Sequence, residues 1–285
     1  MGLFLTCILI FIITINIPIP TTFNVAVKTE RLEFTTVDNN NSRLPLNNVQ
    51  VYNYNGDSLG IENGSFQISV GSNVLVERIS NGPLIIQIIG KDNQSAGLFY
   101  SAEQDEIKKK AENFVEFLVQ NPSERTKNGE TIVVPISGEV VLGKTINYES
   151  YSSSTALVKS GTITMVGKSL LGNQFFESGS YNLNIGDQFG VENPESKAYG
   201  FVAINEDPAM TAAYRVLGKK GKISTPGPVE ENAGYYISTS LISRFLFDSF
   251  FQGISWAIAS IVILATTIPF LNDLEQFFFK KRKKK

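Results

Sequence analysis

Apolar and polar residues alternate through most of the first hundred positions. Short alternating runs begin at Phe23, Leu32, Val49, Phe66, Val74 and Leu84. In a β-strand successive side chains point to opposite faces, so a period of two predicts a half-buried strand. Asn55-Gly56 separates two of the runs and is a strong hairpin signal. We therefore expect a compact antiparallel sheet or sandwich here.

The same alternation returns in the second half of the chain. We predict strands at 131–135, 139–142, 156–158, 161–166, 181–185, 189–191, 198–204 and 212–217. A polar stretch near residues 121–130 precedes them and is our candidate boundary between two β-rich lobes, residues 23–122 and residues 123–243. The predicted fold class is mainly β and antiparallel.

One segment has the spacing of an amphipathic helix instead. Ser101 and Gln104 fit a capping box, and Asn121-Pro122 would end the helix. The apolar face of this helix would be formed by Ile107, Ala111, Phe114, Val115 and Leu118. We predict a central helix that either packs on the sheet or presents a docking surface to a partner helix.

The C-terminal region has the pattern of a membrane helix. Residues 254–271 carry no charge over 18 positions, and residues 280–285 are all basic. We expect a transmembrane and juxtamembrane segment at 244–279. The positive-inside rule places the 280–285 tail in the cytoplasm. The alternative is a buried core helix of a soluble domain.

Residues 1–22 are also apolar and form either an uncleaved signal anchor or a cleaved signal peptide. Gly2 with Thr6 also fits the pattern for N-myristoylation. Either export signal would place the β-rich region outside the cytoplasm, in a periplasmic, extracellular or lumenal compartment. The expected protein is thus a β-rich extracytoplasmic region flanked by N- and C-terminal membrane helices.

Composition excludes several kinds of chemistry. The chain has no histidine and one cysteine, Cys7, so it lacks the commonest general base, the usual zinc ligands and any intrachain disulfide. There are 25 Lys and Arg against 27 Asp and Glu; without the six tail residues the balance is 19 against 27, or −8. Such an acidic body is a poor match for nucleic acid. We predict no metal and no cofactor.

Residues 138–145 match the phosphate-loop pattern GxxxxGK[ST]. A working phosphate loop must follow a strand and open a helix whose amides hold the phosphate. Here the four variable residues, Glu139 to Leu142, are themselves strand-like, and the Tyr- and Ser-rich stretch that follows is not helical. We interpret the segment as a hairpin with glycine ends and expect no nucleotide.

Two hydrolytic chemistries stay open without histidine. A Ser/Lys dyad would combine Ser137 or Ser169 with Lys144 or Lys168. Paired carboxylates for glycoside cleavage are the second. The available acids are Glu192, Glu195, Glu206 and Asp207. They lie in loop-like, proline-containing stretches, so exposed turn acids are the simpler interpretation, as is a turn role for Asp187.

Three further sets of residues suggest surface roles. Asn40, Asn63 and Asn93 each begin a glycosylation triplet. Aromatic side chains crowd the second lobe, where they form core or a carbohydrate or protein contact surface. They are Phe175, Phe176, Tyr181, Phe189, Tyr199, Phe201, Tyr214, Tyr235 and Tyr236. Ala257, Ala259 and Ser260 are small enough for close contact between membrane helices.

The sequence assigns no catalytic, cofactor-binding or metal-binding residue. Our preferred hypothesis is a non-enzymatic, membrane-anchored binding or scaffold protein of the cell envelope or a lumen. Its partners would be the lipid bilayer and another membrane or envelope protein, which includes the hypothesis that the chain is a subunit of a membrane complex. The alternative is a membrane-bound hydrolase that uses a Ser/Lys dyad or paired carboxylates.

Overall fold

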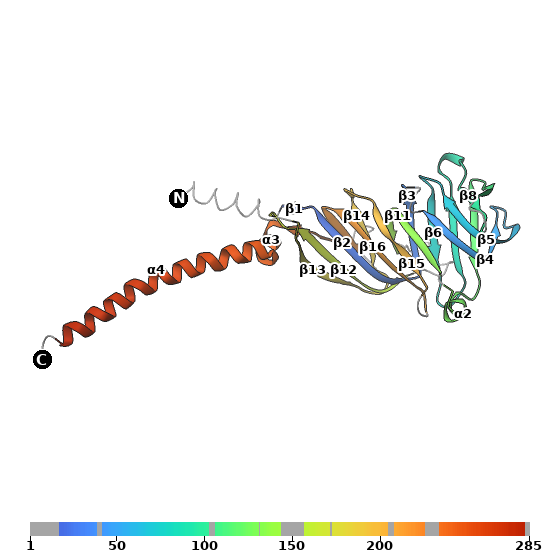
Figure 1. The fold of residues 1–285 in the computed structure, drawn as a ribbon. Coiled ribbons are helices and arrows are strands. Elements are labelled where there is room, and N and C mark those ends of the chain that lie inside the picture. Colours follow the sequence, from blue (N-terminus) through green and yellow to red (C-terminus); the bar gives the residue numbers. More distant parts are fainter. Residues whose placement is uncertain are drawn as a thin grey trace. The chain divides into compact units, whose positions relative to one another are not determined.

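The computed structural model describes residues 17–38, 42–102, 106–130, 132–143, 157–171, 173–204, 208–225 and 234–282 (Figure 1). The chain divides into two compact units. The first, the β unit, comprises residues 18–166 and 179–239. The described part of the second, the helical unit, comprises residue 17, residues 167–178 and residues 240–282.

Strands dominate the β unit. Those before residue 122 are β1 (Pro18–Ile19), β2 (Thr21–Thr29), β3 (Arg31–Thr36), β4 (Arg43–Tyr52), β5 (Ser58–Ile68), β6 (Asn73–Glu77), β7 (Leu84–Ile89), β8 (Gly97–Tyr100), β9 (Ile107–Lys110) and β10 (Phe114–Val119). Those after it are β11 (Val133–Leu142), β12 (Val158–Lys168), β13 (Phe175–Leu183), β14 (Gln188–Glu192), β15 (Ala198–Ala203), β16 (Met210–Gly218), β17 (Lys220–Ser224), β18 (Gly234–Ile237) and β19 (Thr239–Ser240). A single 3₁₀ turn, η1 (Lys91–Asn93), lies between β7 and β8.

Antiparallel pairing joins these strands in a long path. From β9 it runs through β8, β5, β4, β10, β7, β6 and β3 to β11. From β11 it continues through β15 and β16 to β2. A branch runs from β11 through β14 and β17 to β18. Strand makes up 56% of the chain and helix 17%, which confirms the mainly β, antiparallel prediction.

Alternation explains the pairing. In β2 and β16 every second side chain is buried, and the two strands pair over nine positions. Their buried faces join one hydrophobic core that extends from Phe23 to Ile237. Strands from both sides of residue 122 contribute to this core, while the division into lobes 23–122 and 123–243 stays a prediction.

The predicted central helix is wrong. The structure has strands β9 and β10 where the helix was expected, and Gln104 lies outside the described residues. Val115, Phe117 and Val119 are buried, whereas the residues between them are only partly buried. The ring of Phe117 packs against the ring of Phe66, with centroids 5.0 Å apart. Pairing of β10 with both β4 and β7 outweighs the local helical spacing, because it buries this alternating face and satisfies the backbone.

The polar stretch at 121–130 contains a short helix, α2 (Pro122–Lys127), where a loop was expected. Pro122 stands at the first helical turn, where its fixed φ suits a helix and its missing N–H costs nothing. Arg125 donates from Nε to Glu130 Oε2 over 2.7 Å, which ties the end of the turn together.

Strand β11 changes partners at Gly138. Before this residue it pairs with β15, and after it with β3. Gly138 has φ +152°, and a Cβ added there would overlap the carbonyl oxygen of Thr35. Glycine is the residue that reaches this backbone region without strain.

Two buried charged side chains tie loops of the β unit together. Arg78 is 1% exposed and donates to Gly82 O (3.1 Å), Ala209 O (2.6 Å) and Ser123 Oγ (2.6 Å). Glu30 is 4% exposed. Its carboxylate accepts from Ser80 N and from Leu157 N and lies 3.0 Å from Lys159 Nζ.

These contacts also set the ionisation of Glu30. Burial alone would raise its pKa. The hydrogen bonds and the charge of Lys159 stabilise the ionised form more strongly, so the pKa lies below its ordinary value. Glu62 behaves in the same way: burial is opposed by Lys108 and Lys109, each 2.6 Å away, and its pKa is lowered.

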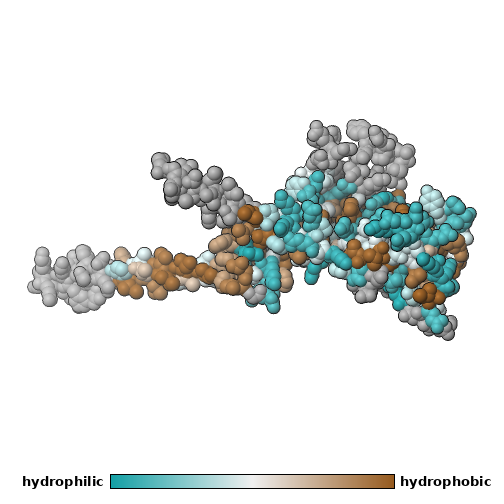
Figure 2. All heavy atoms as spheres, turned by 90° about the horizontal axis from the view of Figure 1, so that it is seen from above, coloured by the Kyte–Doolittle hydropathy of each residue, from teal (hydrophilic) through white to brown (hydrophobic). Residues whose placement is uncertain are grey.

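The helical unit contains α3 (Leu241–Phe247) and the long α4 (Ser249–Arg282). Residues 249–271 of α4 form the one helix of the described chain that is long and apolar enough to cross a membrane. Figure 2 shows apolar atoms along α4, and none of this stretch is buried. The predicted N-terminal membrane helix falls on residues 1–16, outside the described part.

Candidate functional site

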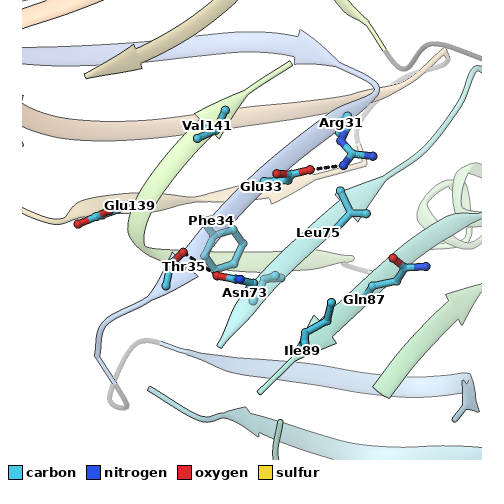
Figure 3. Close-up of a pocket in the computed structure, with 11 residues that line it drawn as sticks. Arg31, Glu33, Phe34, Thr35, Asn73, Leu75, Gln87, Ile89, Glu139 and Val141 are labelled. Atoms are coloured by element: carbon cyan, nitrogen blue, oxygen red, sulfur yellow. Dashed lines mark hydrogen bonds and ion pairs between the residues drawn. The ribbon is translucent and has the colours of Figure 1, made fainter. Parts of the chain in front are cut away.

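A groove of about 350 Å³ lies on the face of the β unit formed by β11, β3, β6 and β7 (Figure 3). The strands present their alternate side chains there: Leu32 and Phe34 of β3 point into the core, whereas Arg31, Glu33 and Thr35 point outward. The other residues of the groove are Asn73, Val74, Leu75, Gln87, Ile89, Glu139 and Val141.

Strand register arranges the outward side chains in two rows, each running from β11 to β7. The first row is Val141, Glu33, Leu75 and Gln87. The second row is Glu139, Thr35, Asn73 and Ile89. Directly opposed side chains in an antiparallel pair lie close enough to interact. The groove therefore combines apolar and polar groups at short spacing.

The polar groups hold one another in place on one side of the groove. Arg31 forms ion pairs with Glu33 and with Glu77, the second at 3.0 Å. Thr35 Oγ1 donates to Asn73 Oδ1 over 2.8 Å. Within the described part of the chain Glu139 has no ion-pair partner, and Figure 3 shows it pointing away from Arg31. With three carboxylates against one guanidinium, the site carries negative charge.

The apolar members of the groove face solvent. Val141 is 51% exposed and Ile89 is 49% exposed. Leu75 lies between them in the sheet and is partly buried. Covering these side chains would be favourable at roughly 25 cal/mol per Å² of apolar surface. The groove is thus suited to a ligand with its own apolar groups and positive charge.

The structure does not bring the predicted Ser/Lys pairs together among the residues it describes. Ser137 is fully buried in β11, and its hydroxyl has no hydrogen-bond partner in the described chain. Ser169 donates to Asp248 Oδ1 over 2.9 Å, and its neighbour Lys168 is exposed. Lys144 lies outside the described residues.

The phosphate-loop match forms a strand, as expected. Residues 138–142 belong to β11 and pair with β3. Their backbone groups are therefore engaged in a sheet and do not form an anion-binding loop. Lys144 and Thr145 lie outside the described residues.

The candidate acids occupy separate environments. Glu192 accepts from the Tyr236 hydroxyl over 2.8 Å, which raises the pKa of that tyrosine. Glu195 lies 3.8 Å from Lys219 Nζ. Asp187 accepts from the backbone N–H of Asn184 over 2.7 Å in the turn before β14, which confirms its turn role. Glu206 and Asp207 lie outside the described residues.

The aromatic side chains of the second half divide between core and surface. Phe189 and Tyr214 are buried in the β unit, and burial raises the pKa of Tyr214. The exposed ones are Phe175, Tyr199, Phe201, Tyr235 and Tyr236. Of the glycosylation candidates, Asn63 and Asn93 are described and Asn40 is not. Asn63 Oδ1 accepts from the backbone of Asn48.

Sequence reasoning missed the groove. Alternation in β3 and β11 indicates which side chains point outward, but it does not indicate that these two strands are neighbours. The groove requires that pairing, because Glu33 and Val141 come from distant parts of the sequence.

Comparison with protein-family models, with curated proteins and with solved structures finds no match to this chain.

Proposed function

We propose that the chain is a membrane-anchored binding or scaffold protein that acts without catalysis. Helix α4 holds it in a bilayer, and the β unit lies on the extracytoplasmic side. The groove binds an extended segment of another membrane or envelope protein. That segment carries apolar side chains together with lysine or arginine.

The anchoring rests on the length and charge of the C-terminal region. Residues 249–271 are 23 in number and form a helix of about 34 Å, enough for a hydrocarbon core of about 30 Å. Trp256 is 75% exposed near the start of this helix, where indole rings favour the membrane interface. Six basic residues at 280–285 favour a cytoplasmic tail.

A single observation carries the binding role. Val141 and Ile89 are half exposed on a sheet face beside the unpaired carboxylate of Glu139. Such apolar groups with nearby charge suit recognition of a protein segment, because apolar contact supplies affinity and charge supplies orientation.

The binding role is tested by photocrosslinking in native membranes. A photoreactive phenylalanine at Val141 is expected to form a discrete crosslink to a second protein. The matched control is the same residue at Ile61, which is 58% exposed on β5 and outside the groove. Glu139→Lys should weaken the crosslink at position 141. Identical crosslinks at both positions, or no effect of Glu139→Lys, would refute the proposal.

The orientation is tested separately. Protease added to the extracytoplasmic side of sealed membranes should digest the β unit and spare a tag placed after Lys285. Digestion of the tag with protection of the β unit would reverse the proposed topology.

A further inference from the structure

The hairpin between β12 and β13 has an apolar tip. Leu170 is 60% exposed, Leu171 is 56% exposed and Phe175 is 65% exposed. Turns of water-facing hairpins are normally built from Gly, Asn, Asp, Pro and Ser. Large apolar side chains gathered at an exposed turn therefore indicate a surface that is covered in the working protein.

This tip is fixed to the start of α4 through Asp248. The residue lies between α3 and α4 and is 1% exposed. Its Oδ1 accepts from Ser169 Oγ over 2.9 Å and from the backbone N–H of Phe250 over 3.0 Å. The carboxylate thus caps the first turn of α4 and holds the hairpin against it.

Two further hydrogen bonds hold the same parts together. Arg244 Nη2 donates to Lys168 O over 3.1 Å, and Ser249 Oγ donates to Gln174 Oε1 over 3.1 Å. All of these residues belong to the helical unit. Hairpin tip, α3 and the first turn of α4 therefore form one built corner.

Helix α3 adds its own apolar side chains to this corner. Phe245 is 54% exposed, Leu246 is 60% exposed and Phe247 is 50% exposed. The ring of Phe245 lies 4.4 Å from that of Phe251 in α4, centroid to centroid. The apolar surface of α3 is thus continuous with that of the helix proposed to cross the bilayer.

The charges at this corner suit a lipid surface. Lys168 and Arg244 carry the cationic groups nearest to the apolar tip in sequence. Long basic side chains bury their aliphatic part while the charged end reaches the headgroups. Aromatic rings such as Phe245 and Phe251 commonly lie at the same depth.

We propose that the β12–β13 tip and α3 insert into the boundary between headgroups and acyl chains of the leaflet that α4 enters. This inference rests on the proposed anchoring by α4. The bilayer is the occupant because the exposed apolar surface leads without interruption into the span beginning at Ser249.

The test uses full-length protein in vesicles of phosphatidylcholine and phosphatidylglycerol with brominated acyl chains. Trp256 is the single tryptophan of the chain and reports on α4. The variant Trp256→Phe/Leu171→Trp reports on the tip, and Trp256→Phe/Phe175→Trp is a second reporter in case position 171 disturbs the hairpin. Both tip reporters should be quenched by bromine near the headgroups, more than by bromine deep in the chains. Aqueous iodide should not reach them.

The outcomes separate the two proposals. If Trp256 is not quenched by brominated lipid, the anchoring itself fails. If Trp256 is quenched while both tip reporters stay bright with lipid bromine and are quenched by iodide, the insertion is refuted. If the tip reporters are shielded from both quenchers, a protein covers the corner, and the lipid assignment is again refuted. Adding Leu170→Asp to the Phe175→Trp reporter should lower its quenching by lipid bromine.

Discussion

Phe117 is the side chain whose removal best distinguishes a strand from a helix at residues 114–119. It is fully buried, and its ring centroid lies 5.0 Å from that of Phe66 and 6.0 Å from that of Phe99. Phe117→Ala removes the ring from a closely packed cluster and leaves a cavity. Truncations of this kind cost about 3–5 kcal/mol.

The effect is measurable by urea unfolding of the full-length protein in detergent micelles, followed by the far-ultraviolet circular dichroism of the strands. With a slope of about 2 kcal/mol per M, the midpoint should fall by about 1.5–2.5 M. The loss is large because a typical domain has only about 5–15 kcal/mol of stability in all.

Leu118→Ala is the matched control. Leu118 is adjacent in sequence but lies on the outer, partly exposed side of β10. Its truncation should cost about 1 kcal/mol, because less apolar surface is lost. A helix with the predicted apolar face would bury Leu118 and leave Phe117 off that face. A larger loss for Leu118→Ala than for Phe117→Ala would therefore refute the strand.

Three further changes test other parts of the β unit. Gly138→Ala should lower stability by about 3 kcal/mol or more, because of its positive φ and the overlap with Thr35; an unchanged urea midpoint would contradict the partner change in β11. The lowered pKa values of Glu30 and Glu62 stabilise the fold above their ordinary value of 4.5, and this contribution should vanish as the pH falls through the folded values. Urea midpoints between about pH 6 and pH 3 should show that decline, and Glu30→Gln should flatten it. Arg78→Met should cost about 3 kcal/mol, since three buried acceptors lose a charged donor; thermal unfolding unchanged from wild type would contradict that role.

The strands could be predicted where one face is buried and the other is not. Phe23, Val25 and Val27 alternate in the sequence and are all buried in β2. Local pattern is sufficient there, because the period of two is unambiguous. The same reasoning found the C-terminal apolar helix, whose composition admits no competing strand.

Residues 107–118 could not be assigned in this way. Their apolar positions fit the helical period over the whole segment and the strand period at Val115 and Phe117. The deciding term is distant in sequence, because β10 pairs with β7 and β4. The groove has the same origin: Glu139 meets Thr35 only because β11 lies beside β3.

Strand β11 has a mechanical consequence. One unbroken backbone passes from the ladder with β15 into the ladder with β3, and Glu139 and Val141 follow directly after the crossing at Gly138. Tension on either ladder is carried through that peptide chain to the other. A segment clamped over Val141 would therefore also oppose the peeling of β15, so that occupancy on one side strengthens the protein against force on both.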